Sequence, residues 1–280
     1  QSGTGTITLG DSDTGLILIG NSTVGGTSTG NITLGAVTGS SHTLNLGVDG
    51  TSNTISVGGI VSLGTLNIST NSTATFTAAV GSSSALTNLN IKSGSTFNEN
   101  VTSTNITINN AITGTFKKAI TATAIVLDGG KLLLSEDNSV TIAGTINGNN
   151  TTEGTIQVTG ATKTFSGIVG GSQVLTLVDI DDIAVFSANV SATTANLAAT
   201  TTFGGDTTLT TLTIQSASYN VIFNGSSNTI TNAANFQNTG TVTFGNGSGD
   251  SSTFNGGLTT TAPSQINVGG TLQTSNDAMS

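Results

Sequence analysis

The sequence has 280 residues, of which 38 are glycine and only 7% are charged, and its formal net charge is −9. All five basic residues are lysines, so it lacks the clustered Lys and Arg side chains that neutralise nucleic-acid phosphates or dock on anionic membranes. Cysteine is absent, which excludes disulfides and thiolate metal sites, and no apolar run approaches the roughly twenty residues of a membrane helix. We therefore expect no nucleic-acid partner and no direct membrane insertion.

The residue pattern indicates an ordered protein, and the first residues bear on whether the sequence has been processed. Ile, Leu, Val and Phe alternate steadily with small polar residues, and Pro263 is the single proline, whereas disordered chains combine low hydrophobicity with high charge and frequent proline. The first residues, from Gln1 on, lack the basic and apolar regions of a secretory signal peptide. We expect either that a signal was removed or that the sequence is an excerpt of a longer precursor.

The first third of the chain carries short strand phrases that mostly end in glycine. These phrases span residues 6–10, 16–20, 31–35, 43–47, 54–58 and 65–69. Most of them alternate apolar and small polar residues, which is the period of a half-buried strand. A glycine after the last inward residue can adopt the positive φ of a sharp turn. Leu46, Val57 and Ile68 are spaced by half of a coil of about 22 residues.

From about residue 70 a longer phrase recurs about every twenty residues. In this phrase a Phe is followed four residues later by a branched aliphatic residue and then by two alternating aliphatic residues. Its copies are Phe76, Val80, Leu89 and Ile91; Phe97, Val101, Ile106 and Ile108; Phe116, Ile120, Ile125 and Leu127; and Phe254, Leu258, Ile266 and Val268. Phe165, Phe186 and Phe203 follow at intervals of 21 and 17 residues. A short period of this kind indicates units that bury their apolar faces against their neighbours.

These patterns predict an all-β fold, a right-handed parallel β-helix (a β-solenoid) of about 20 residues per coil. Short strands with small-residue turns would also fit a sandwich or a barrel. The solenoid is favoured because the period is one coil long and equivalent positions carry equivalent residue types. No charged or proline-rich linker divides the chain, so we predict a single continuous solenoid over residues 1–280, with a change of repeat style near residue 70.

The sequence contains no evident combination of catalytic residues. His42 is the only histidine, and a Ser-His-Asp triad needs its histidine between a nucleophile and a carboxylate. Its place directly before a strand phrase predicts an exposed turn residue. Gly10-Asp11-Ser12 and Gly249-Asp250-Ser251 resemble the Gly-Asp-Ser-Gly loop of serine proteases, but neither continues with glycine, so both are predicted to be Asx-type turns. We predict no catalytic residue.

The densest acidic cluster is Asp179, Asp181 and Asp182, inside the apolar run 172–186. Residues 179 and 181 of a strand face the same way, so Asp179 and Asp181 are the candidate ligands of a calcium ion. The favoured alternative is a solvated corner between two strands, with the turn at Asp181-Asp182. Glu136-Asp137-Asn138 is predicted to be a turn as well. We predict no cofactor beyond this candidate calcium ion.

Thr-x-Thr motifs raise the question of ice binding, which requires one such motif in each coil at a fixed register. Thr6-x-Thr8, Thr208-x-Thr210 and Thr241-x-Thr243 occur, but they are too scattered along the sequence to predict that register. We therefore do not expect ice binding.

The repeat vocabulary resembles that of a known family. The relevant phrases are Thr-Leu-Asn-Ile at 65–68, Gly-Thr-Val-Thr-Phe-Gly-Asn-Gly at 240–247, Ser-Thr-Phe-Asn-Gly-Gly at 252–257 and Ile-Asn-Val-Gly-Gly-Thr-Leu at 266–272. They resemble the passenger regions of type V autotransporters and are most similar to the large rickettsial outer-membrane surface antigens. The resemblance covers most of the chain. It implies a right-handed β-helical passenger that is secreted through the envelope and displayed at the cell surface, for adhesion to host cells or as a crystalline coat.

Two classes of non-enzymatic function are therefore expected. The first is a passenger-type adhesin or surface antigen, in which loops or one face bind a host-surface receptor or another passenger. The second is a structural subunit of an S-layer, sheath or extracellular filament that self-associates end to end through open β-helix edges as a homopolymer. Both roles place the protein outside the cell, at a bacterial surface. An enzyme is the weakest class, and we expect none.

Overall fold

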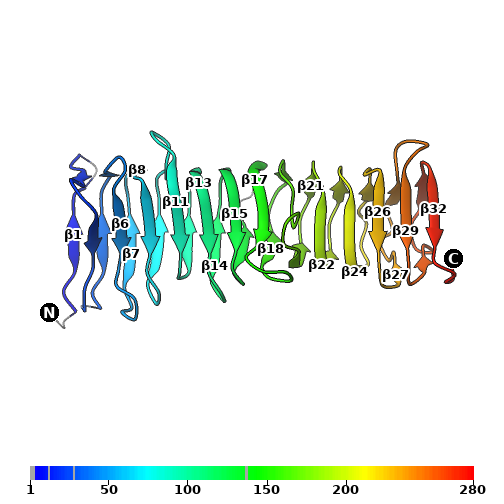
Figure 1. Cartoon of the computed structure of the whole chain (residues 1–280), viewed down its shortest axis with the longest axis horizontal. Coiled ribbons are helices and arrows are strands. Elements are labelled where there is room, and N and C mark those ends of the chain that lie inside the picture. Colours follow the sequence, from blue (N-terminus) through cyan, green and yellow to red (C-terminus); the bar gives the residue numbers. More distant parts are fainter. Residues whose placement is uncertain (1–3, 12, 28, 136–137) are drawn as a thin grey trace. The chain divides into compact units, whose positions relative to one another are not determined.

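The computed structural model describes residues 4–11, 13–27, 29–135 and 138–280, and every regular element in these ranges is a β-strand. The strands pair in parallel, and the chain forms about 13 turns of roughly 21 residues each. The predicted parallel β-solenoid is thus confirmed. Two compact units divide the chain, Gln1–Ser135 (unit 1) and Glu136–Ser280 (unit 2). Within each unit the coils follow one another in sequence order (Figure 1).

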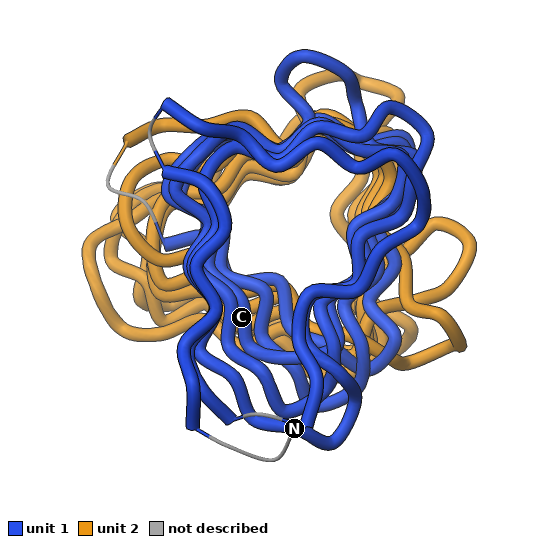
Figure 2. The backbone as a smooth tube through the Cα atoms, turned by 90° about the vertical axis from the view of Figure 1, so that its left-hand side faces the viewer, with its two compact units in different colours: residues 1–135 blue, residues 136–280 orange. Residues whose placement is uncertain are grey.

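The coils of unit 1 build three parallel sheets around one interior, seen end-on in Figure 2. The first sheet contains, in order, β1 (Ile7–Leu9), β4 (Ile32–Leu34), β7 (Thr54–Val57), β10 (Thr73–Phe76), β12 (Ser95–Phe97), β14 (Thr113–Phe116) and β16 (Lys131–Leu134). The second contains β3 (Ser22–Val24), β6 (Thr43–Leu46), β9 (Thr65–Ile68), β11 (Leu86–Ile91), β13 (Val101–Ile108) and β15 (Ile120–Leu127). The third contains β2 (Leu16–Ile17), β5 (Val37–Thr38) and β8 (Val61–Ser62).

The change of repeat style predicted near residue 70 lies inside unit 1. Each coil before this point has three separate strands, one in each sheet. In the next coil Val80 forms only isolated bridges, to Val61 and Val101, in place of a third-sheet strand. From there on the eight-residue strands β13 and β15 cover two sides of the coil without a break. The Phe-led phrase is therefore a coil in which two short strands have merged into one.

Unit 2 repeats this construction with two main sheets. One contains β17 (Val140–Gly148), β19 (Lys163–Phe165), β21 (Ala184–Phe186), β23 (Thr201–Phe203), β25 (Val221–Phe223), β28 (Thr241–Phe244) and β31 (Gln265–Val268). The other contains β18 (Thr155–Val158), β20 (Leu175–Ile180), β22 (Val190–Leu197), β24 (Thr207–Ile214), β26 (Ser227–Ile230), β29 (Ser251–Phe254) and β32 (Thr271–Thr274). A small sheet pairs β27 (Ala234–Asn235) with β30 (Leu258–Thr259).

Identical inward residues of successive coils stack on one another. In unit 1 the rings of Phe76, Phe97 and Phe116 lie parallel, with centroids 4.8 and 4.7 Å apart, and all three side chains are buried. In unit 2 Phe165 stacks on Phe186 at 4.6 Å. The aliphatic residues of the phrase behave alike, since Leu89, Ile106 and Ile125 pair in register in the second sheet. Such ladders bury the apolar face of every coil on its neighbours.

Turns between strands use glycine in two ways. Gly10 and Gly47 follow the last inward residue of a strand with φ of 74° and 78°, as the sequence predicts. Gly35 does not have a positive φ, but a Cβ atom there would lie 2.4 Å from the carbonyl oxygen of Asp11 in the preceding coil. Leu46 pairs with Ile68 in the second sheet, while Val57 belongs to the first. The half-coil spacing of these three residues is confirmed.

One inward position of unit 2 holds a lysine, which the repeat does not predict. Lys163 is 0% exposed and pairs with Val140 on one side and Ala184 on the other. Its ammonium group donates hydrogen bonds to the backbone carbonyls of Ala161 and Asn138. A buried charge is tolerated only when such partners replace its water shell. The side chain therefore serves to tie two turns together at this corner.

Replacing Phe97 with Ala is expected to lower the free energy of unfolding of the surrounding coils by about 3–5 kcal/mol, because it removes the middle ring of a buried stack and leaves a cavity. Native-state hydrogen exchange of the amides in β10, β12 and β14 measures this loss. Thr96→Ala is the matched control, since Thr96 is the adjacent residue and points outward. Equal protection in Phe97→Ala and Thr96→Ala would contradict the assignment.

Candidate functional site

His42 lies in the turn that leads into β6, as the sequence predicts, but its side chain is half-buried rather than exposed. Its backbone N–H donates to the Gly39 carbonyl (2.7 Å), and its carbonyl accepts from Gly64 and Thr65. The side chain lines a cavity of about 470 Å³ together with Ser40, Ser41, Ser62 and Ser84, among other residues. No carboxylate belongs to the described lining of this cavity. The structure therefore places serines, but no acidic partner, around the only histidine.

The acidic residues proposed as calcium ligands lie at a corner of unit 2. Asp179 is on β20, and Asp181 follows the end of that strand. One oxygen of Asp181 accepts a hydrogen bond from Gln157 Nε2 (2.8 Å), and Asp182 Oδ1 accepts one from the Ile183 N–H (2.7 Å). The predicted turn between two strands is confirmed, since β20 ends at Ile180 and β21 begins at Ala184. No group of three or more His, Cys, Asp or Glu side chains in the described ranges is placed to hold a metal ion.

Asp11 forms its predicted Asx-type turn, but the same prediction is wrong for Asp250, whose carboxylate accepts hydrogen bonds from residues that precede it rather than follow it. Asp11 Oδ1 accepts from the N–H groups of Asp13 (2.9 Å) and Thr14 (2.7 Å), and Asp250 Oδ2 accepts from those of Asn246 and Gly247, each at 2.8 Å. The two backbone hydrogen bonds hold the pKa of Asp11 below its ordinary value. Both carboxylates are thus engaged in holding turns. Ser12 and Glu136-Asp137 lie outside the described residues.

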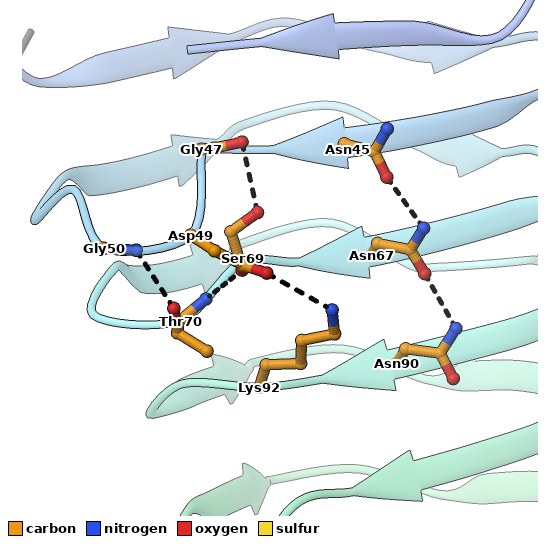
Figure 3. Close-up of polar contacts among 9 residues, drawn as sticks. All are labelled: Asn45, Gly47, Asp49, Gly50, Asn67, Ser69, Thr70, Asn90 and Lys92. Carbon is orange, nitrogen blue, oxygen red and sulfur yellow. Dashed lines mark hydrogen bonds and ion pairs between the residues drawn. The ribbon is translucent and has the colours of Figure 1, made fainter. Parts of the chain in front are cut away.

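The second sheet of unit 1 carries an asparagine ladder on its outer face, formed by Asn45, Asn67 and Asn90 (Figure 3). Asn67 Nδ2 donates to Asn45 Oδ1, and Asn90 Nδ2 donates to Asn67 Oδ1, both at 2.7 Å. Asn45 in turn donates to Thr23 Oγ1 at 3.2 Å. Two residues earlier on each strand, Asn105 donates to Asn88 Oδ1 (3.2 Å) in a shorter ladder. These amides therefore bond to one another from coil to coil.

Beside the ladder, a polar cluster joins the turns of neighbouring coils (Figure 3). Asp49 Oδ1 accepts from the Thr70 N–H at 2.9 Å, and Asp49 Oδ2 lies 3.6 Å from Lys92 Nζ. The Thr70 N–H is the main cause that lowers the pKa of Asp49, with a smaller contribution from Lys92. Both charged side chains are well exposed, so this ion pair contributes little to stability. Its role is to align the turns.

The outer face of the first sheet carries a different array, which we call the hydroxyl column. Its members occupy one position in each of six consecutive strands, β1, β4, β7, β10, β12 and β14. They are Thr8, Thr33, Ser56, Thr75, Thr96 and Thr115, which the strand pairing places side by side. Three of them are exposed (Thr8, Thr33 and Thr75) and three are half-exposed. At β16 the column ends with Leu133.

Sequence reasoning missed this column, although a signal for it exists. Each member directly precedes the last inward residue of its strand, as in Thr33-Leu34, Ser56-Val57 and Thr75-Phe76. The three Thr-x-Thr motifs considered in the sequence do not share one column, since Thr208-x-Thr210 lies on β24 and Thr241-x-Thr243 on β28 of another sheet. The pairing of the strands in unit 1 instead aligns single threonine and serine positions. The first sheet is therefore the part of the molecule in which one chemical group recurs most regularly on the surface.

Comparisons with known proteins give no relative: no family model, no curated protein and no solved structure matches the chain. Among the residues described, no helix has the length and apolar character needed to cross a membrane.

Asn67→Ala is expected to lower the free energy of unfolding by about 1–2 kcal/mol, because it removes two side-chain hydrogen bonds at the centre of the ladder. Chemical denaturation followed by circular dichroism measures the change. Thr104→Ala is the control, since Thr104 is exposed on β13 and no hydrogen bond of its side chain is lost. If the ladder does not stabilise the fold, Asn67→Ala and Thr104→Ala will have the same free energy of unfolding.

Proposed function

We propose that the protein is a non-enzymatic, surface-displayed β-solenoid of the autotransporter-passenger type that acts as an adhesin. The resemblance of its repeat phrases to those of passenger regions supports this proposal. So does the solenoid fold of both units, because a passenger needs a repetitive scaffold that presents side chains to the outside. Asp, Glu, Lys and Arg make up only 7% of the chain, so neutral polar groups supply most of the contacts that its outer surface offers.

The hydroxyl column is the observation that carries the proposal. It repeats one chemical group over six consecutive strands on a single face of unit 1. A partner with repeated binding groups can engage several coils together, so weak contacts add up to strong attachment. Adhesion to a cell surface rich in repeated polar groups is the function that such an array supports best.

Beads coated with the full chain are expected to bind cultured epithelial cells in a saturable manner, with binding that rises steeply with coating density because attachment is multivalent. Flow cytometry measures the bound beads, and soluble chain competes for them. Beads coated with the chemically unfolded chain are the matched control, because composition and charge are the same. The proposal fails if folded and unfolded coatings bind equally.

A structural subunit that self-associates end to end is the second candidate, and the C-terminal coil favours it. In this coil Ile266 and Val268 are 40% and 51% exposed, although they pair with the buried residues Val242 and Phe244 of the preceding coil. They thus occupy inward positions at an open sheet edge. A further coil stacked on β31, from a second copy or from additional residues of the same polypeptide, would bury both side chains. Open strand edges promote such pairing.

If end-to-end assembly occurs, electron microscopy at rising protein concentration is expected to show unbranched filaments, and Val268→Lys is expected to abolish them because a lysine at the edge opposes strand addition. Ile183→Lys is the control, since Ile183 is 39% exposed in unit 2 but lies between β20 and β21, away from this edge. Isolated particles at every concentration, or filaments that survive Val268→Lys, would eliminate this candidate.

A further inference from the structure

The side chains of the hydroxyl column are free of protein partners. Among the residues that the structure describes, no hydrogen bond joins any of the six hydroxyl groups to another side chain or to the backbone. The asparagine ladder on the second sheet is the opposite case, because its amides bond to one another at 2.7 Å. The same strand spacing therefore gives one face whose amides bond to one another and one whose hydroxyl groups are all available to the solvent.

A second column reinforces the first and makes the array two-dimensional. Two residues before each member of the hydroxyl column, in the strand or directly before it, stand Thr6, Asn31, Thr54, Thr73, Gly94 and Thr113. The pairing of Thr54 with Thr73 shows that this column shares the register. Polar groups therefore repeat at about 4.8 Å from strand to strand and at about 6.6 Å along each strand.

The face also carries no charge. No charged residue occupies either column from β1 to β14. Lys131 and Leu133 end the two columns at β16. The array is therefore a net of neutral polar groups in register across six strands.

A groove runs beside the start of the hydroxyl column. Glycines follow the strands at Gly10, Gly35 and Gly58, and with Thr8 and Thr33 they line a hollow of about 370 Å³. Asp11 is the one carboxylate of this lining, and it is engaged by the N–H groups of Asp13 and Thr14. The hollow exceeds many times the roughly 30 Å³ that one liquid water occupies. It can therefore hold several water molecules next to the hydroxyl column.

We propose that this face binds ice. A surface of ice is a neutral, two-dimensional net of water molecules that present O–H donors and oxygen acceptors, and its repeat distances are comparable to those of the paired columns. Each threonine supplies one hydroxyl to such a net and a methyl group that excludes disordered water. A crystalline polysaccharide is the competing planar partner, but sugar rings pack on exposed aromatic side chains, and all ten Phe side chains of this chain are buried. This inference does not depend on the adhesin proposal.

The test uses the full chain and single ice crystals. The chain is expected to shape the growing crystal and to open a gap between its melting and freezing temperatures. Thr75→Tyr and Thr33→Tyr are each expected to lose most of this gap, because a bulky ring in the middle of the array lifts the ice surface off its neighbours. Thr104→Tyr, which adds the same ring on an exposed position of β13 outside the array, is expected to keep it. Circular dichroism establishes that the variants are folded.

The proposal is overturned if the chain neither shapes ice nor separates the two temperatures. It is also overturned if Thr104→Tyr loses as much of the gap as Thr75→Tyr, or if neither Thr75→Tyr nor Thr33→Tyr loses it. Pull-down with microcrystalline cellulose and chitin distinguishes the competing partner. Retention on these solids that Thr75→Tyr abolishes, together with unshaped ice, would assign the face to a polysaccharide.

Discussion

The stacking of inward side chains from one coil onto the next is the interaction on which the rest of this structure depends. Phe76, Phe97 and Phe116 lie within 5 Å of their neighbours as parallel rings, and the aliphatic positions repeat the arrangement. Because side chains alternate across a strand, a slip of one residue would turn Phe97 outward and Thr96 inward. The apolar ladder therefore fixes the register of each strand, and every outward residue is placed by the same constraint.

The outer faces show two consequences of that register. An amide carries both donors and an acceptor and can reach the next strand, so the stacked residues Asn45, Asn67 and Asn90 bond to one another along the second sheet. A threonine or serine hydroxyl has a shorter reach, and the groups from Thr8 to Thr115 remain unbonded on the first sheet. The choice between amide and hydroxyl at one position per coil thus decides whether a face serves stability or recognition. Both proposed activities, adhesion and ice binding, draw on the second outcome.

Much of the fold could be predicted from the sequence, because the inward residues can be recognised from their immediate neighbours: they are apolar residues that alternate with small polar ones. The phrase from Phe97 to Ile108 and the spacing of Leu46 and Ile68 give the strands and the pairing directly. The hydroxyl column could not be found by period, because its members are separated by 25, 23, 19, 21 and 19 residues. Turns of different length absorb these differences, and only the pairing of the backbone restores the alignment. The burial of Lys163 was equally hidden, since the carbonyls that accept its hydrogen bonds belong to turns.

The register of the first sheet is the central claim, and pairs of engineered cysteines test it directly because the chain has no cysteine of its own. Thr75→Cys with Thr96→Cys places two thiols on paired positions of adjacent strands, about 4.8 Å apart between Cα atoms, within the range of a disulfide. Thr75→Cys with Thr115→Cys lies two strands apart, about 9.6 Å, beyond that range. Under mild oxidation the first pair is predicted to cross-link and the second to remain reduced. Equal cross-linking of both pairs, or none in the first, would contradict the account.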